Sequence, residues 1–151
     1  MIVDVSHLSD AGFYDVARAA KKPFVASHSN ARAVCPWCRN LTDDMIRVLA
    51  DKGGVTGLNF CPAFLECDEK GNGRPGSAKA IAVHARYIVN VGGIECLGLG
   101  SDFDGIEIHE ELYDASRMNL LWDALKKEGF TEAQIDQIFY KNVLRLYREV
   151  L

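Results

Sequence analysis

The sequence predicts an α/β fold with a parallel sheet, made of about four strand–helix units followed by two helices at the C-terminal end. Two observations predict it. Short apolar or β-branched runs alternate with amphipathic stretches, and polar caps or glycines separate the two kinds of segment. No linker or low-complexity segment divides the 151 residues, so we expect a single domain over 1–151 with one hydrophobic core.

The first two units occupy the N-terminal third of the chain. Residues 1–6 (MIVDVS) form the first predicted strand, and Ser9 is a suitable N-cap for the amphipathic helix that follows. The second strand is predicted at 23–29 (PFVASHS). After a polar loop, Thr42 caps a predicted helix at 43–52, which two glycines end.

The next two units follow the same pattern. A third strand is predicted at 55–60 (VTGLNF), and a Gly-rich turn region at 67–77 leads into a helix at 78–91 with one apolar face. The fourth strand is predicted at 95–101 (ECLGLGS), and a loop containing the letters DFDG comes after it. Strands that alternate with helices in this way indicate βαβ units with right-handed crossovers.

Two helices are predicted at the C-terminal end, over 115–129 and 132–151. The second begins with the Thr-x-x-Gln capping box that starts at Thr131. Two histidines have structural interpretations: His84 lies among apolar neighbours in a predicted helix and is expected to pack there, and His109 lies in an acidic loop where simple exposure explains it.

Composition and charge exclude several classes of partner. The formal net charge is −4, from 17 basic and 21 acidic residues, and the basic residues are scattered, so we expect no nucleic-acid partner. No apolar run approaches the ~18 residues of a membrane-spanning helix, and no secretory signal is recognisable at the start. We therefore expect a cytoplasmic protein that does not associate with a membrane and has a small-molecule partner.

Polar residues collect where the predicted strands end. Asp4 and His7 end the first strand, His28 the second, Asn59 the third and Asp102 the fourth. In parallel α/β folds the carboxyl ends of strands share one rim, where ligands bind. Imidazole and carboxylate groups suit zinc and similar divalent metals. The alternative is that the histidines hydrogen-bond a loop and that the DFDG segment is a solvated turn.

Arg39 is a candidate for binding an anionic group. It lies in the loop after the second strand, where its guanidinium could bind a carboxylate through two parallel hydrogen bonds. The alternative is a surface arginine near a helix N-terminus. Such a terminus favours negative charge, so an arginine gains nothing there from the helix dipole, which favours the binding role.

The segments DVSHLSDAGFYDV, ASHSNARAVCPWCRNLTDD, GLGSDFDG and FYKNVLRLYREV resemble the membrane (renal) dipeptidase family of zinc peptidases, in order and over essentially the whole chain. The resemblance implies a (β/α)₈ TIM-barrel-like metallo-hydrolase fold. It also implies hydrolysis of the single peptide bond of a dipeptide by water held between two zinc ions.

The resemblance also assigns roles to individual residues. His7 and His28 match two zinc-binding histidines, and Arg39 matches the arginine that binds the free carboxylate of the dipeptide. Asp102 matches an acidic catalytic residue that also contacts substrate, and Gly105 matches a position that shapes the loop.

A complete member of that family is about twice as long, and its first half supplies a His-x-Asp metal pair and a bridging glutamate that this sequence lacks. The resemblance therefore implies a C-terminal half-barrel with open sheet edges. Two functions are expected: a zinc dipeptidase that needs a complementary N-terminal half or a homodimer, or an inactive half-barrel that acts as a structural or partner-binding module.

The Cys-x-x-Cys spacing of Cys35 and Cys38 has three interpretations: a redox dithiol, part of a zinc cage with Cys61 and Cys67, or loop thiols without a catalytic role. A redox dithiol is expected directly at a helix N-terminus, but three residues separate Cys38 from the predicted cap. The spacing of the other two cysteines is irregular for zinc. We expect these thiols to be structural.

Overall fold

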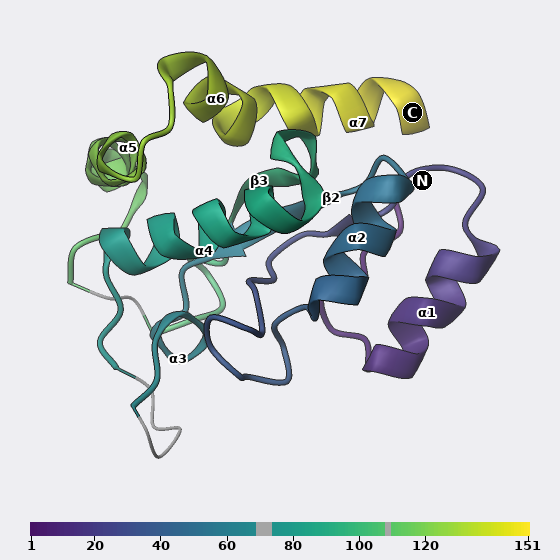
Figure 1. The fold of residues 1–151 in the computed structure, drawn as a ribbon, viewed down its shortest axis with the longest axis horizontal. Helices are drawn as coiled ribbons and strands as arrows, with labels where there is room; N and C mark the ends of the chain where they lie inside the picture. Colours follow the sequence, from purple (N-terminus) through teal and green to yellow (C-terminus); the bar gives the residue numbers. More distant parts are fainter. Residues whose placement is uncertain (69–73, 108–109) are drawn as a thin grey trace.

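The structure is a computed structural model that describes residues 1–68, 74–107 and 110–151. Part of the Gly-rich turn region and His109 lie outside these ranges. Three parallel strands form a sheet in the order β1–β2–β3, and helices lie against it (Figure 1). This confirms the predicted parallel α/β arrangement. The strands are β1 (Val25–Ala26), β2 (Val55–Asn59) and β3 (Leu97–Ser101).

The helical elements follow the predicted order. The N-caps at Ser9, Thr42 and Thr131 are confirmed, because each side chain accepts a hydrogen bond from the first turn of its helix. The elements are α1 (Asp10–Ala19), α2 (Asp43–Asp51), α3 (Pro62–Leu65), α4 (Ala78–Gly92), η1 (Ile94–Cys96), η2 (Ala115–Arg117), α5 (Met118–Lys127), α6 (Glu132–Asp136), η3 (Gln137–Lys141) and α7 (Asn142–Val150).

The two N-terminal strands are much shorter than predicted. Residues 1–6 contribute one isolated parallel bridge, between Asp4 and Val25, and β1 has two residues instead of seven. The reason is that side-chain oxygens accept hydrogen bonds from backbone amides that a longer pair of strands would use. The Ser27 amide donates to the Asp4 carboxylate at 3.0 Å, and the His28 amide donates to Ser6 Oγ at 2.9 Å. Regular strand pairing therefore stops before His28.

Glycine allows the central strands to pass close to the loop that follows β1. A Cβ on Gly57 of β2 would lie 2.1 Å from the carbonyl oxygen of Ser27, and a Cβ on Gly100 of β3 would meet the same oxygen at 2.1 Å. Only glycine fits at both positions. Farther along, the register shifts between Leu58 and Asn59, so that Asn59 pairs with Ser101 at the end of β3.

One face of the sheet is covered by α2 and α4, which lie in front of β2 and β3 in Figure 1. Their apolar stripes, including Ile46, Leu49, Ile81 and Ile88, are fully buried against Leu58 and its neighbours in the main core. A smaller cluster joins the start of the sheet to α7. It contains Val55, Leu146 and Val150, with Ile2, Val25 and Val143 packed against it.

The C-terminal segment differs from the prediction in its helical pitch. The predicted helix over 132–151 is α6, a π-helical stretch η3 and α7 in succession. Its buried Asn142 donates from Nδ2 to the carbonyl oxygens of Ile94 and Leu97, both at 2.8 Å, which fixes the segment to the start of β3. No helix in the described ranges has the length and apolarity to span a membrane.

Candidate active site

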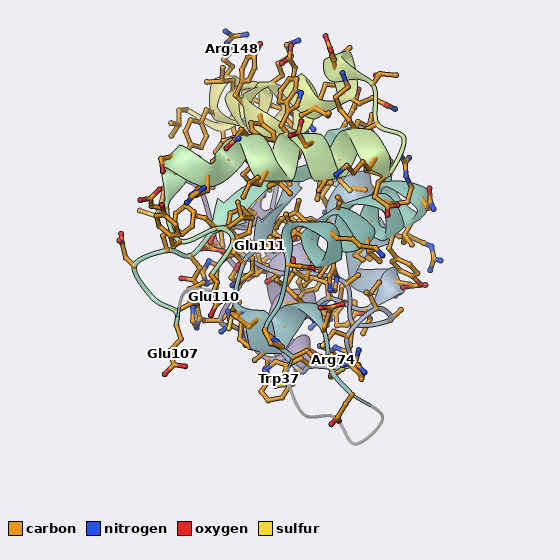
Figure 2. All side chains as sticks on the ribbon, turned by 90° about the vertical axis from the view of Figure 1, so that its left-hand side faces the viewer. Trp37, Arg74, Glu107, Glu110, Glu111 and Arg148 are labelled. Atoms are coloured by element: carbon orange, nitrogen blue, oxygen red, sulfur yellow. The ribbon has the colours of Figure 1, made fainter. Side chains whose placement is uncertain are left out.

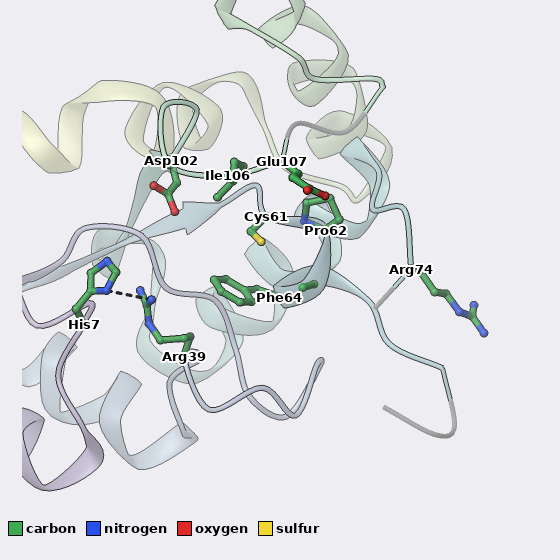
Figure 3. Close-up of a pocket in the computed structure, with 11 residues that line it drawn as sticks. His7, Arg39, Cys61, Pro62, Phe64, Arg74, Asp102, Ile106 and Glu107 are labelled. Atoms are coloured by element: carbon green, nitrogen blue, oxygen red, sulfur yellow. Dashed lines mark hydrogen bonds between the residues drawn. The ribbon is translucent and has the colours of Figure 1, made fainter. Parts of the chain in front are cut away.

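The sequence-predicted residues meet at the carboxyl ends of the strands. His7 follows the Asp4 bridge, His28 lies two residues after β1, and Asp102 comes directly after β3. With Arg39, His7 and Asp102 line a pocket of about 600 Å³ (Figure 3). His28 does not line the pocket but contacts the His7 ring. The structure thus brings all four predicted side chains to one place.

The two imidazoles converge through the same ring nitrogen. Nε2 of His7 lies 2.9 Å from Nε2 of His28, and the ring centroids are 4.9 Å apart with the planes tilted by 59°. Partial burial lowers the pKa of His28, although the charges of Asp102 and Asp4 oppose that shift. Burial thus favours the neutral imidazole, the form that binds metals.

The spacing of the two nitrogens suits a shared metal ion. Two nitrogen ligands of one tetrahedral zinc lie about 3.3 Å apart, close to the separation of the two Nε2 atoms. Within the described part of the chain, however, no group of three or more His, Cys, Asp or Glu side chains is arranged to hold a metal. The two histidines fit a metal as part of its ligand set, and at least one further ligand is needed.

Behind His28, a serine and an aspartate form a hydrogen-bonded pair. Ser27 Oγ lies 2.7 Å from Nδ1 of His28 and 2.5 Å from Oδ2 of Asp4. The other Asp4 oxygen accepts from the amides of Ser6 and Ser27, both at 3.0 Å. Partial burial raises the pKa of Asp4, but the hydrogen bonds from Ser27 and Ser6 outweigh it, and the pKa lies below its ordinary value.

The loop that carries Arg39 is closed on itself by hydrogen bonds. Ala31 and Leu41 pair as an isolated parallel bridge at its two ends. The buried side chain of Asn40 donates from Nδ2 to the carbonyl oxygens of Cys35 and Phe64, each at 2.9 Å. The loop therefore holds Arg39 on a fixed backbone although it lies outside the sheet.

A bidentate ion pair ties this loop to α1. The guanidinium of Arg32 contacts both carboxylate oxygens of Asp10 at 2.8 Å. It also donates to the carbonyl oxygens of Asn40 and Cys38, at 2.7 and 2.9 Å. The hydrogen bonds from Arg32 lower the pKa of Asp10, so the pair persists at neutral pH.

The Arg39 guanidinium is only partly satisfied by the protein. Its Nε donates to the carbonyl oxygen of Ser6 at 2.8 Å, and Nη1 lies 3.2 Å from Nδ1 of His7. Its Nη2 is buried and, in the described part of the chain, has no hydrogen-bond partner. A buried donor without an acceptor is costly. The free N–H groups therefore mark a place for an anionic ligand atom.

Asp102 lines the pocket and belongs to a strained turn that follows β3. Its φ of 71° and the φ of 21° at Ser101 are rare for residues with a side chain. Asn59 holds the carboxylate by donating from Nδ2 to Oδ2 at 3.1 Å. Gly105 is close enough that a Cβ there would lie 2.6 Å from Asp102 Oδ1, which supports a loop-shaping role for this glycine.

The wall between these charged groups is largely apolar. Cys61, Pro62 and Phe64 come from the short helix α3 and its N-terminal side, which the sequence did not predict, and Ile106 faces them from the loop after β3 (Figure 3). Arg74 extends away from the pocket centre, and in the side view of Figure 2 it lies at the same end of the molecule as Trp37.

The cysteines do not form the Cys-x-x-Cys pair that their spacing suggests. Cys35 lies with its Sγ 3.2 Å from Sγ of Cys67, whereas Cys38 is exposed. Burial, together with the hydrogen bond to Cys67, raises the pKa of Cys35 to about 12. A thiol with so high a pKa is not a nucleophile at neutral pH, in line with the structural role expected for it.

The sequence placed Asn59 at the end of its strand but did not predict its hydrogen-bond partners, and it gave no role to Ser27, although Ser27 directly precedes His28. Asn30 and Asn59 exchange two hydrogen bonds, because Asn30 Nδ2 donates to the Asn59 carbonyl oxygen at 2.9 Å and the Asn59 amide donates to Asn30 Oδ1 at 3.0 Å. The position of these amides at the strand ends was the available signal.

The family model described as Membrane dipeptidase (Peptidase family M19) matches residues 1–151. An uncharacterized protein encoded in the pqqA 5′ region of Klebsiella pneumoniae is 41% identical over 99% of this chain. An uncharacterized dipeptidase of Schizosaccharomyces pombe is 35% identical, also over 99% of this chain.

Among solved structures, a metallo peptidase from Rhodobacter sphaeroides liganded with a phosphinate mimic of the dipeptide L-Ala-D-Ala superimposes with a TM-score of 0.90. It is 34% identical and is matched over 98% of this chain. In every case the match covers only part of the other protein. The chain spans 55% of the Klebsiella protein, 36% of the Schizosaccharomyces protein and 42% of the Rhodobacter chain.

Proposed function

The chain belongs to the membrane dipeptidase family, peptidase family M19, a family of metallopeptidases, and on that premise we propose that it forms the carboxylate-binding side of a zinc-dependent dipeptidase site. The pocket is lined by side chains of both charges, Arg39 and Arg74 on one hand and Asp102 and Glu107 on the other. A dipeptide at neutral pH has one carboxylate and one ammonium group, so Arg39 and Asp102 can complement it.

The observation that carries the proposal is the buried, unpartnered Nη2 of Arg39. A carboxylate accepts hydrogen bonds from guanidinium nitrogens in a planar, two-point arrangement. We assign Arg39 to bind the free carboxylate of the dipeptide. Because the ion pair of Arg32 with Asp10 and the hydrogen bonds of Asn40 fix the loop, Arg39 would place the peptide bond at a defined distance.

We assign His7 and His28 as zinc ligands through their convergent Nε2 atoms. Zinc would polarise the carbonyl of the peptide bond and lower the pKa of water to near neutrality. Asp102 lines the same pocket, and we assign it as the catalytic carboxylate, which accepts a proton and hydrogen-bonds the substrate. The remaining metal ligands would come from a complementary N-terminal half or from a second copy of the chain.

A second candidate function is a non-catalytic module that binds a partner chain. It is favoured by the small number of metal-ligating side chains that the described residues bring together. The two candidates differ in metal content. Stoichiometric zinc in the purified chain, lost in a His28→Ala variant, would favour the dipeptidase, and zinc at the level of that variant would favour the module.

The carboxylate assignment is tested by calorimetric titration with L-Ala-D-Ala, and turnover by release of free alanine. We expect Arg39→Gln to weaken binding by about 10-fold or more, the usual loss for a hydrogen bond to a charged group. Arg148→Gln is the matched control, since Arg148 is exposed at the far end of the molecule (Figure 2).

The C-terminal amide of the same dipeptide separates carboxylate binding from other effects. This amide should bind the unmodified protein weakly, and its affinity should not change in the Arg39→Gln variant. Equal affinity of acid and amide for the unmodified protein would refute the role of Arg39. If binding depends on Arg39 but no alanine is released, Arg39 does bind the carboxylate and the chain alone is not a catalyst.

A further inference from the structure

Ser27 and Asp4 form a directional hydrogen-bonded chain with the two histidines. The chain runs from Arg39 through His7, His28 and Ser27 to Asp4, with separations of 3.2, 2.9, 2.7 and 2.5 Å along its four contacts. The groups at the two ends have fixed roles. A guanidinium can only donate, and an ionised carboxylate can only accept.

The acceptor end determines where the protons of Ser27 and His28 lie. Asp4 accepts from two backbone amides as well as from Ser27 Oγ, as an ionised carboxylate does. The only hydroxyl proton of Ser27 therefore points to Asp4. The contact between Ser27 Oγ and His28 Nδ1 then requires a proton on Nδ1, and the lone pair of the neutral ring lies on Nε2.

The donor end is compatible with this direction in the metal-free protein. Because Nη1 of Arg39 donates to Nδ1 of His7, a neutral His7 ring carries its proton on Nε2 and donates it to Nε2 of His28. Zinc at Nε2 of His7 would require that proton to move to Nδ1 and the contact with Arg39 to open, so only the Asp4 end can fix the tautomer of His28 both with and without metal.

We propose that Asp4 and Ser27 are positioning residues that hold His28 as the Nδ1–H tautomer, with its Nε2 lone pair directed toward His7 and the pocket. The tautomer of a histidine is set by the partner of its other ring nitrogen. For a metal site this matters because only the nitrogen without a proton can bind the ion. The role in metal binding rests on the proposed function, whereas the tautomer itself does not.

The tautomer is measured by long-range ¹H–¹⁵N correlation spectroscopy on the metal-free, histidine-labelled protein at about pH 8, where histidines are neutral. A His28→Gln variant identifies the His28 signals. We expect Nδ1 to carry the proton in the unmodified protein. A proton on Nε2 of His28 would overturn the proposal at once, whatever the variants show.

Asp4→Asn is the sharpest variant, because it is almost isosteric. Its Oδ1 can still accept from the two backbone amides, so its NH₂ group faces Ser27 and donates to Oγ. The hydroxyl proton of Ser27 then turns to Nδ1 of His28, and the tautomer should change to Nε2–H. An unchanged tautomer in a folded Asp4→Asn protein would contradict the proposal.

A second set of variants keeps the test decisive if Asp4→Asn does not fold. Ser27→Ala should release the preference for Nδ1–H, and Ser27→Thr, which keeps a hydroxyl, should restore it. Ser29→Ala is the matched control, since the Ser29 hydroxyl contacts Ser6 and not the His28 ring. If Ser27→Ala leaves the tautomer as in the unmodified protein, Ser27 does not set it.

Zinc titration of the same variants connects the tautomer to the proposed function. Loss of such a supporting partner typically weakens metal binding by about 10- to 100-fold. If the unmodified chain binds no zinc, the metal assignment fails while the tautomer result stands. If zinc binds equally well to the unmodified protein and to a Ser27→Ala protein with an altered tautomer, the positioning role in metal binding is refuted.

Discussion

Acidification should destabilise the fold through His84, a buried histidine that joins two segments of the pocket. Its Nδ1 accepts from the Ala31 amide at 3.1 Å, and its Nε2 lies 2.9 Å from the Leu65 carbonyl oxygen, to which it donates. Burial lowers the pKa of His84 from 6.5 to about 4, even though the bond to Leu65 opposes the shift. Its position on α4 confirms the packing role predicted for it.

The direction of the effect follows from proton binding. The unfolded chain takes up a proton at His84 below pH 6.5, whereas the folded protein does so only below about 4. The stabilisation is fully present above pH 6.5 and is lost as the pH falls from 6.5 to 4. One pKa unit corresponds to about 1.4 kcal/mol, so the full loss is about 3 kcal/mol, of which about 2 kcal/mol is lost by pH 5.

Urea unfolding of the unmodified protein and of His84→Gln, at pH 8 and pH 5, isolates this contribution. Glutamine cannot gain a proton here but can still accept from Ala31 and donate to Leu65, so the variant should lose about 2 kcal/mol less than the unmodified protein between the two values. Parallel losses in the two proteins would refute the reasoning. An NMR titration of His84 in the native protein checks the pKa directly.

Three further substitutions test the close approaches and the cap. Gly57→Ala places a Cβ 2.1 Å from the Ser27 carbonyl oxygen and should destabilise the protein by about 3 kcal/mol in urea unfolding. Gly105→Ala would displace the Asp102 carboxylate, so calorimetry should show about 10-fold weaker binding of L-Ala-D-Ala with little change in thermal stability, since Gly105 is exposed. Thr131→Ala removes a capping box far from the pocket and should cost about 1 kcal/mol by urea unfolding while dipeptide binding stays unchanged.

The helices and their caps were predictable because their signals are local. The N-caps of α1, α2 and α6 and the glycines after α2 and α4 lie next to the segments that they delimit. Strand lengths were not predictable in the same way. The extent of β1 depends on the Asp4 side chain, which takes the amide of Ser27 from the ladder, and only the tertiary structure shows this.

The candidate site was predicted as a set of residues but not as a network. Spacing and strand ends led to His7, His28, Arg39 and Asp102, which the fold does bring together. The hydrogen-bond partners of these residues depend on how the strands are paired. Asn59 reaches Asp102 because the register shift between β2 and β3 pairs Asn59 with Ser101. The proximity of Cys35 to Cys67 likewise depends on how the loop packs, whereas the local spacing suggested Cys38 as its partner.

The π-helical stretch η3 affects which face of the C-terminal helical segment is buried. The buried positions of this segment follow one another in steps of three, four, four and four residues, which is 3.75 residues on average. They are Ile135, Ile138, Asn142, Leu146 and Val150. In a uniform α-helix this stripe would rotate by about 60° over fifteen residues. One wider turn cancels much of that rotation, so a single straight face reaches from α5 to the first residues of the sheet. Deleting one residue within Gln137–Lys141 would restore regular pitch and turn the last two helical turns away from the small cluster around Val55.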